Sequence, residues 1–117
     1  MALLDGKHCS YGELLFRPEW KLKREIILAR DNYTCQLTGD RTSHHNVHHL
    51  NGFDKFVDQR LDQHNAITLS EKIHTEFHKM YGYGNNTKEQ FFEFVDMLYS
   101  QNRITTEYYI NFVENFK

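Results

Sequence analysis

The spacing of apolar residues along the chain predicts four helices, each with charged or polar residues between its apolar positions. The first helix runs from about Pro18 to Arg30, with Trp20 and residues 26–28 as its apolar positions. Proline suits the start of a helix, because its missing N–H would lack a helical partner there. The irregular segment before it includes residues 11–16, whose composition fits a short strand.

The other three helices carry start or stop signals. Ser70 is a good N-cap for a helix that begins at Glu71 and ends at Gly82 or Gly84. Thr87 and Gln90 have the spacing of a capping box, which predicts a helix over about residues 88–100. A last helix begins near residue 106. The two C-terminal helices place apolar residues at helical spacing: Phe91, Phe94, Val95 and Leu98, then Tyr109, Phe112, Val113 and Phe116.

Between the first two helices, the pattern predicts strands and loops. Residues 47–50 predict a short strand that pairs back on Tyr33–Leu37 in a hairpin, with turn residues at Thr38–Asp40. Residues 51–66 are expected to form a loop with some helical content. We therefore predict one α+β domain over residues 1–117, with its core motif at about 30–82 and a helical part at about 87–117.

Composition limits the class of protein. A chain of 117 residues fits a single core, and no apolar run approaches the roughly 18 residues that span a membrane. Cys9 and Cys35 form no CxxC pair and suit a reducing compartment, so a cytoplasmic protein is expected. The net charge of −2 argues mildly against a strongly basic nucleic-acid-binding surface.

Histidine is the unusual residue of this chain: there are eight, and seven lie between His44 and His78. On a helix, His74 and His78 share one face and offer two imidazole nitrogens to one metal ion. Two surface histidines on an amphipathic helix are the ordinary alternative. A third ligand is expected from the adjacent pair His48 and His49, whose side chains point to opposite faces of a strand unless a bulge intervenes.

His49, Asn65 and His74, in this order within a strand–loop–strand–helix unit, resemble the HNH nucleases of the ββα-metal type. The resemblance includes Trp20, the segment RDNYTCQLTG (30–39), and YGYGNNT with EQFFEFV further on, and so covers about residues 20–95. Within this family, the chain looks like the small phage-type or homing-type endonucleases. The final helix lies outside it.

The resemblance implies a role for each motif residue. His49 would be the general base that deprotonates the water attacking a phosphodiester, and Asn65 would tie down the loop that keeps this base oriented. His48, His74 and His78 would hold one divalent ion, which stabilises the leaving 3′ oxygen. Imidazole ligands favour transition metals such as Zn, Ni, Mn or Co, and the family keeps Mg open.

The chain departs from many HNH proteins in its cysteines. Those proteins brace the motif with a structural zinc held by two CxxC pairs, whereas Cys35 stands alone here, with Thr38 at the partner position. We therefore expect no structural zinc. The aromatic helices after residue 88 are expected to close the core by packing instead.

The expected function is that of a metal-dependent HNH endonuclease that hydrolyses DNA in a bacterial or phage-infected cell. Four basic residues could either contact DNA phosphates or be ordinary solvated side chains: Arg30, Arg41, Lys55 and Arg60. A non-catalytic metal-containing DNA-binding module of the same fold is the main alternative. A structural zinc site would leave His49 and Asn65 without a role. A toxin-like nuclease with an immunity partner, and a homodimer that cuts both strands, stay open.

The remaining histidines are interpreted as ordinary surface residues. His44 and His45 are expected in a solvated turn, His64 in a loop, and His8 is assigned no role. Cys35 is expected to be a small buried residue rather than a nucleophile.

Overall fold

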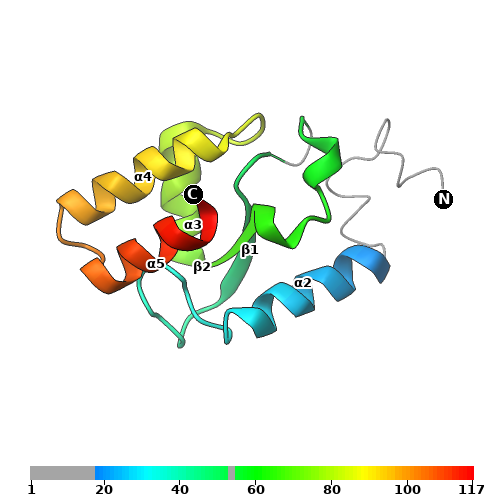
Figure 1. Cartoon of the computed structure of the whole chain (residues 1–117), viewed down its shortest axis with the longest axis horizontal. Coiled ribbons are helices and arrows are strands. Elements are labelled where there is room, and N and C mark those ends of the chain that lie inside the picture. Colours follow the sequence, from blue (N-terminus) through cyan, green and yellow to red (C-terminus); the bar gives the residue numbers. More distant parts are fainter. Residues whose placement is uncertain (1–17, 53–54) are drawn as a thin grey trace.

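The computed structural model describes residues 18–52 and 55–117, so the strand expected at 11–16, His8 and Cys9 lie outside the described residues. The fold belongs to the α+β class, as predicted (Figure 1). None of the helices in this described part is long and apolar enough to cross a membrane. The elements are, in chain order, α2 (Pro18–Arg30), β1 (His45–His49), the 3₁₀ turns η2 (Val57–Gln59) and η3 (Gln63–Asn65), β2 (Ala66–Ser70), α3 (Glu71–Tyr81), α4 (Lys88–Ser100) and α5 (Thr106–Phe116).

The two strands pair with each other in an antiparallel sheet, in which His48 lies opposite Ile67 and His49 opposite Ala66. The predicted hairpin with Tyr33–Leu37 was therefore wrong. Residues 32 and 33 have positive φ angles of 57° and 51°, which place the entry to that segment in the left-handed region instead of a strand. The segment still lies beside β2, where the Gln36 N–H donates to the Thr68 carbonyl at 3.0 Å.

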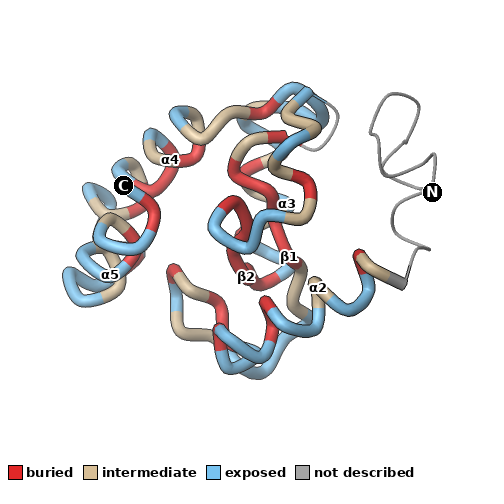
Figure 2. The backbone as a smooth tube through the Cα atoms, turned by 45° about the vertical axis from the view of Figure 1, so that its right-hand side comes forward, coloured by how far each residue is buried: buried red, intermediate tan, exposed pale blue. Residues whose placement is uncertain are grey.

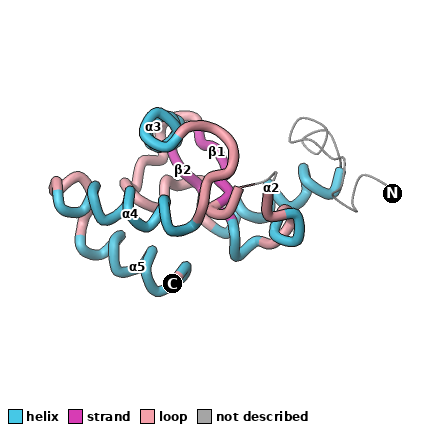
Figure 3. Tube along the Cα trace, turned by 90° about the horizontal axis from the view of Figure 1, so that it is seen from above, coloured by secondary structure: helices cyan, strands magenta, loops and turns pink. Residues whose placement is uncertain are grey.

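The strand pair separates two groups of buried side chains. On one side Trp20, Ile27 and Leu28 of α2 pack with Val47 and Ala66. On the other side, Ile67 and Leu69 of β2 belong to one buried cluster with residues of α3, α4 and α5. Of these helices, α3 contacts the strands, α4 contacts α3, and α5 contacts α4 (Figure 3). Because adjacent side chains of a strand alternate between faces, neighbouring residues of β1 contribute to different sides.

The C-terminal helices close the core by packing, as predicted. Phe91 of α4 lies 5.4 Å from Phe77 and 5.5 Å from Phe112 between ring centroids. The inner faces of these helices are buried and their outer faces exposed (Figure 2). The buried residues predicted on α4 and α5 are confirmed at six positions: Phe91, Phe94, Val95, Leu98, Phe112 and Phe116.

The predicted helix ends are also confirmed. Ser70 Oγ accepts a hydrogen bond from the Ile73 N–H at 3.4 Å at the start of α3. At the start of α4, Thr87 Oγ1 accepts from the Gln90 N–H, and Gln90 Oε1 accepts from the Thr87 N–H, both at 3.1 Å. Because β2 ends at the residue that caps α3, the strand and the helix are joined without a loop.

Candidate metal centre

Three histidines from two elements converge, and we call them the three-histidine cluster: His48 of β1, and His74 and His78 of α3. Each offers one ring nitrogen, and these nitrogens all lie within 4.8 Å of one another. The Nε2 atoms of His74 and His78 are 3.0 Å apart, as expected for residues one turn apart on a helix. The cluster could hold a metal ion.

His48 is the buried member of the cluster, with 3% of its surface exposed. Its ring stacks on Phe91 at 5.0 Å between centroids and meets Phe77 edge-on at 4.9 Å. Among the described residues, its Nε2 has no hydrogen-bond partner although it is buried. An unpaired buried polar atom costs about 1–3 kcal/mol, so a nitrogen kept in this position beside two other imidazoles fits a metal ligand.

His78 is held by the loop that follows α3. Its Nδ1–H donates to the Gly82 carbonyl at 2.9 Å, so a neutral ring carries its lone pair on Nε2, as a ligand does. The exposed ring of Tyr83 stacks on His78 at 4.3 Å with a 10° angle between planes. Positive φ angles at Gly82 and Gly84, 78° and 87°, form the turn around Tyr83. Sequence reasoning missed Tyr83, although its flanking glycines are a visible signal.

His74 contacts a residue that sequence reasoning also missed. Its Nδ1 lies 3.3 Å from the side-chain amide Nδ2 of Asn46. Asn46 precedes His48 by two positions in β1, so both side chains lie on the same face of the strand. This two-residue spacing is visible in the sequence and predicts that Asn46 lies on the same face as His48.

The distances and protonation states of the cluster suit a metal ion. Two nitrogens bound to one tetrahedral zinc at about 2.0–2.1 Å lie about 3.3–3.4 Å apart, close to the 3.0 Å between His74 and His78. Burial, then repulsion from the neighbouring imidazoles, lowers the pKa of His48 well below 6.5. The same two causes lower the pKa of His74 to about 4. Both rings are therefore neutral at neutral pH, the form that binds metals.

His49 lies on the other face of β1. Its ring packs on Trp20, with centroids 4.8 Å apart, and its Nε2–H donates to the Arg60 carbonyl at 2.9 Å. Because a carbonyl only accepts, the neutral ring carries its lone pair on Nδ1. Burial is the main reason that the pKa of His49 is lowered below 6.5. The adjacent rings of His48 and His49 thus diverge, as expected, and His49 is not a member of the cluster.

The side-chain amide of Asn65 is hydrogen-bonded to the backbone of Asn51. Its Oδ1 accepts from the Asn51 N–H at 2.8 Å, and its Nδ2 donates to the Asn51 carbonyl at 2.9 Å. Asn51 in turn accepts from the Lys88 N–H at 2.8 Å through its own Oδ1. This Asn65–Asn51 clamp fixes the chain just beyond β1 and joins it to the start of α4.

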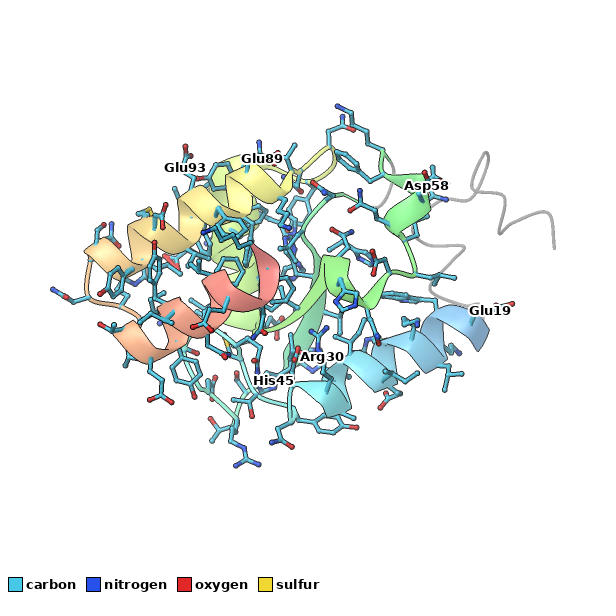
Figure 4. The ribbon with its side chains drawn as sticks, in the orientation of Figure 1. Glu19, Arg30, His45, Asp58, Glu89 and Glu93 are labelled. Carbon is cyan, nitrogen blue, oxygen red and sulfur yellow. The ribbon has the colours of Figure 1, made fainter. Side chains whose placement is uncertain are left out.

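The four basic residues considered for phosphate contact have different surroundings. Arg30 donates to Gln63 O at 2.7 Å and to Ala66 O at 2.8 Å, and pairs with Asp31 at 2.8 Å. It therefore braces the end of α2 against η3 and the start of β2 (Figure 4). Arg60 is buried, with 7% of its surface exposed. Arg41 and Lys55 are exposed, as a phosphate contact requires.

The expectation of a solvated turn was wrong for His45. It begins β1, is half-buried, and its Nε2–H donates to the Asp40 carbonyl at 2.7 Å. Strand pairing with Ser70 holds it in place. His44 and His64 are exposed, as expected, and Cys35 is buried.

No protein-family model, no curated protein and no solved structure matches the chain. Function must therefore be inferred from the chain's own chemistry, namely the three-histidine cluster, His49 and the Asn65–Asn51 clamp.

Proposed function

We propose that the chain is a metal-dependent endonuclease of the HNH type that hydrolyses phosphodiester bonds in DNA. One observation carries the proposal. An antiparallel strand pair followed directly by a helix brings ring nitrogens of His48, His74 and His78 within 4.8 Å of one another, and His49 directly follows His48. This order of elements is the one expected of a ββα-metal unit.

The three-histidine cluster is the proposed holder of the ion. When bound, a divalent ion supplies Lewis-acid stabilisation to the negative charge that develops on the scissile phosphate and the leaving oxygen. Three protein ligands leave coordination positions for water and substrate, which separates such a site from a closed structural zinc site. Imidazole donors favour Zn or Ni, and Mn and Mg are tested beside them because water can fill the rest of their coordination shell.

His49 is the proposed general base. It is neutral at neutral pH because burial lowers its pKa, and its Nδ1 is the nitrogen able to take a proton from the attacking water. The Arg60 carbonyl sets the orientation of the ring. The Asn65–Asn51 clamp holds the segment that follows the base, so Asn65 acts as a positioning residue.

One observation favours a non-catalytic metal-containing DNA-binding module instead. His49 is only 6% exposed and packs on Trp20. A general base must come within hydrogen-bond reach of its water, directly or through a second water. A histidine with a purely structural role would also be buried. A measurement of nuclease activity therefore distinguishes the two functions.

The deciding experiment is a plasmid-nicking assay with the full chain, stripped with EDTA and reloaded with Zn, Mn, Ni or Mg. We expect wild type to nick with at least one metal and to stop when EDTA is added. Since general-base catalysis contributes roughly 10²–10⁴-fold, His49→Ala should lose about that factor while binding metal normally. The exposed His64 provides the matched control, and His64→Ala should cut like wild type.

Two results would change the conclusion. If His49→Ala folds, binds metal and cuts as fast as wild type, His49 is not the base. If wild type cuts neither DNA nor RNA with any of the four metals, the binding-module function replaces the nuclease.

A further inference from the structure

The hydrogen bonds of His74 and His78, two members of the three-histidine cluster, form one continuous chain from Gly82 to Asn46, and the Gly82 end fixes its direction. The Gly82 carbonyl only accepts, so the proton of His78 lies on Nδ1 and its Nε2 accepts. The nitrogen that donates to it at 3.0 Å is Nε2 of His74. Nδ1 of a neutral His74 is then an acceptor, and its partner at 3.3 Å is the amide group of Asn46.

A metal ion on Nε2 of His74 replaces the hydrogen bond to His78 and reverses the direction of the bond between Nδ1 of His74 and Asn46. Nε2 must give its lone pair to the ion, so the proton of the neutral ring moves to Nδ1. Nδ1 then donates, and its partner has to accept. A side-chain amide can do both, because rotating it by half a turn exchanges its N–H donors for its carbonyl oxygen.

We propose that Asn46 is a positioning residue for the metal centre: its amide donates to Nδ1 of His74 in the hydrogen-bonded chain and accepts from the same atom when His74 binds an ion. β1 would then supply a ligand, His48, and, two residues earlier, the support for a ligand on α3. The inference rests on the metal centre of the proposed function, and it is independent of whether the protein cuts DNA.

Two substitutions separate the donor role of Asn46 from its acceptor role. Leucine has a similar size but neither donates nor accepts, whereas aspartate accepts only, which is the role needed with the ion bound. Loss of a supporting hydrogen bond to a ligand typically costs 10–100-fold in metal affinity. We expect Asn46→Leu to weaken zinc binding by about that factor, and Asn46→Asp to bind zinc at least as tightly as wild type.

The affinity test is a competition titration of the full chain with Zn²⁺ against a chromophoric chelator. The matched control is Asn111→Leu, the same change at an exposed position of α5 that should leave zinc affinity unchanged. Circular dichroism establishes that each variant is folded. If Asn46→Leu binds zinc within threefold of wild type, the inference is wrong.

A second readout reports the position of the proton directly. ¹⁵N spectra of histidine side chains should place the His74 proton on Nε2 in EDTA-treated protein and on Nδ1 in zinc-loaded protein. Asn46→Asp should move this proton to Nδ1 even in EDTA, an effect that mere packing would not produce. A proton on Nε2 in zinc-loaded wild type would overturn the inference. If wild type binds no zinc, the metal centre itself fails; if wild type binds zinc and Asn46→Leu binds it equally, only this inference fails.

Discussion

Replacing His48 with leucine should stabilise the protein in EDTA and destabilise it in zinc. The change removes a buried Nε2 that lacks a partner among the described residues, a relief of about 1–3 kcal/mol. It also removes the ring contacts with Phe91 and Phe77, which are worth about 0.5–1.5 kcal/mol for a pair. Burial of the leucine side chain offsets part of that loss. We expect a net gain of about 1 kcal/mol in EDTA.

Zinc should reverse the order of stability, so that wild type becomes more stable than the leucine variant. An ion that binds only the folded state stabilises it by about 2.7 kcal/mol at a free concentration of 100 times the dissociation constant. The leucine variant keeps His74 and His78 but loses the third ligand, so it should gain little. At that zinc concentration, wild type should be more stable than the variant by roughly 2 kcal/mol.

Thermal unfolding followed by circular dichroism, in EDTA and in zinc, measures both effects. One kcal/mol corresponds to a shift of about 3–5 °C for a domain of this size. Thr68→Val is the matched control, because Thr68 Oγ1 is also buried and, within the described part of the chain, also lacks a partner. Thr68 is not a member of the three-histidine cluster, so Thr68→Val should raise the midpoint equally in both conditions.

Two outcomes would refute this reasoning. A leucine variant less stable than wild type in EDTA would mean that His48 is a well-satisfied core residue. An equal zinc-induced rise in wild type and variant would mean that His48 is not a ligand.

Three further predictions concern the Asn65–Asn51 clamp, the hydrogen bonds of Arg30, and the pH dependence of stability. Asn65→Leu should lower the free energy of unfolding by about 2–5 kcal/mol in a urea titration, because it leaves two Asn51 backbone groups unpaired. Arg30→Lys should cost about 1–3 kcal/mol, since lysine cannot reproduce the forked contacts; weaker DNA binding at unchanged stability would instead indicate a phosphate contact. In EDTA, stability should fall as pH drops from about 6.5 towards 4, because His74 binds its proton more readily in the unfolded chain; urea titrations should show a loss of roughly 2 kcal/mol by pH 5, and a flat profile would contradict the burial of His74.

The helices could be predicted from the sequence because their ends depend on residues only a few positions apart. The Thr87–Gln90 capping box and the Ser70 cap each join a side chain to a backbone group three residues away. Such pairs are visible in the sequence itself. The bounds predicted for α2, α4 and α5 accordingly agree with the structure.

The strand partner could not be predicted in this way. The segment Tyr33–Leu37 has strand-like residues, but the positive φ angles at Asn32 and Tyr33 turn the chain at its start. The true partner, Ala66–Ser70, is buried along its whole length, and that burial depends on helices from both ends of the chain. Strand preference follows such surroundings more than local composition.

Helix and strand periodicity predicted the relative positions of four histidines in the candidate site. Helical spacing placed His74 beside His78, and strand alternation separated His48 from His49. Asn46 was missed because strand alternation predicts only that it shares the face of His48, and does not predict its contact with His74 on α3. Whether His49 acts as a base stays a prediction, because position alone does not establish reactivity.

The pairing register of the two strands has a consequence for how this chain can tolerate insertions and deletions. A slip of one residue turns every side chain of a strand to its opposite face. Deleting one residue within β1 ahead of His48 would therefore exchange the surroundings of the two adjacent imidazoles, whereas a length change in the connection between β1 and β2 would leave the register intact. Sequence variation compatible with function should thus collect in the connection away from Asn51, Arg60 and Asn65, and β1 should keep its length.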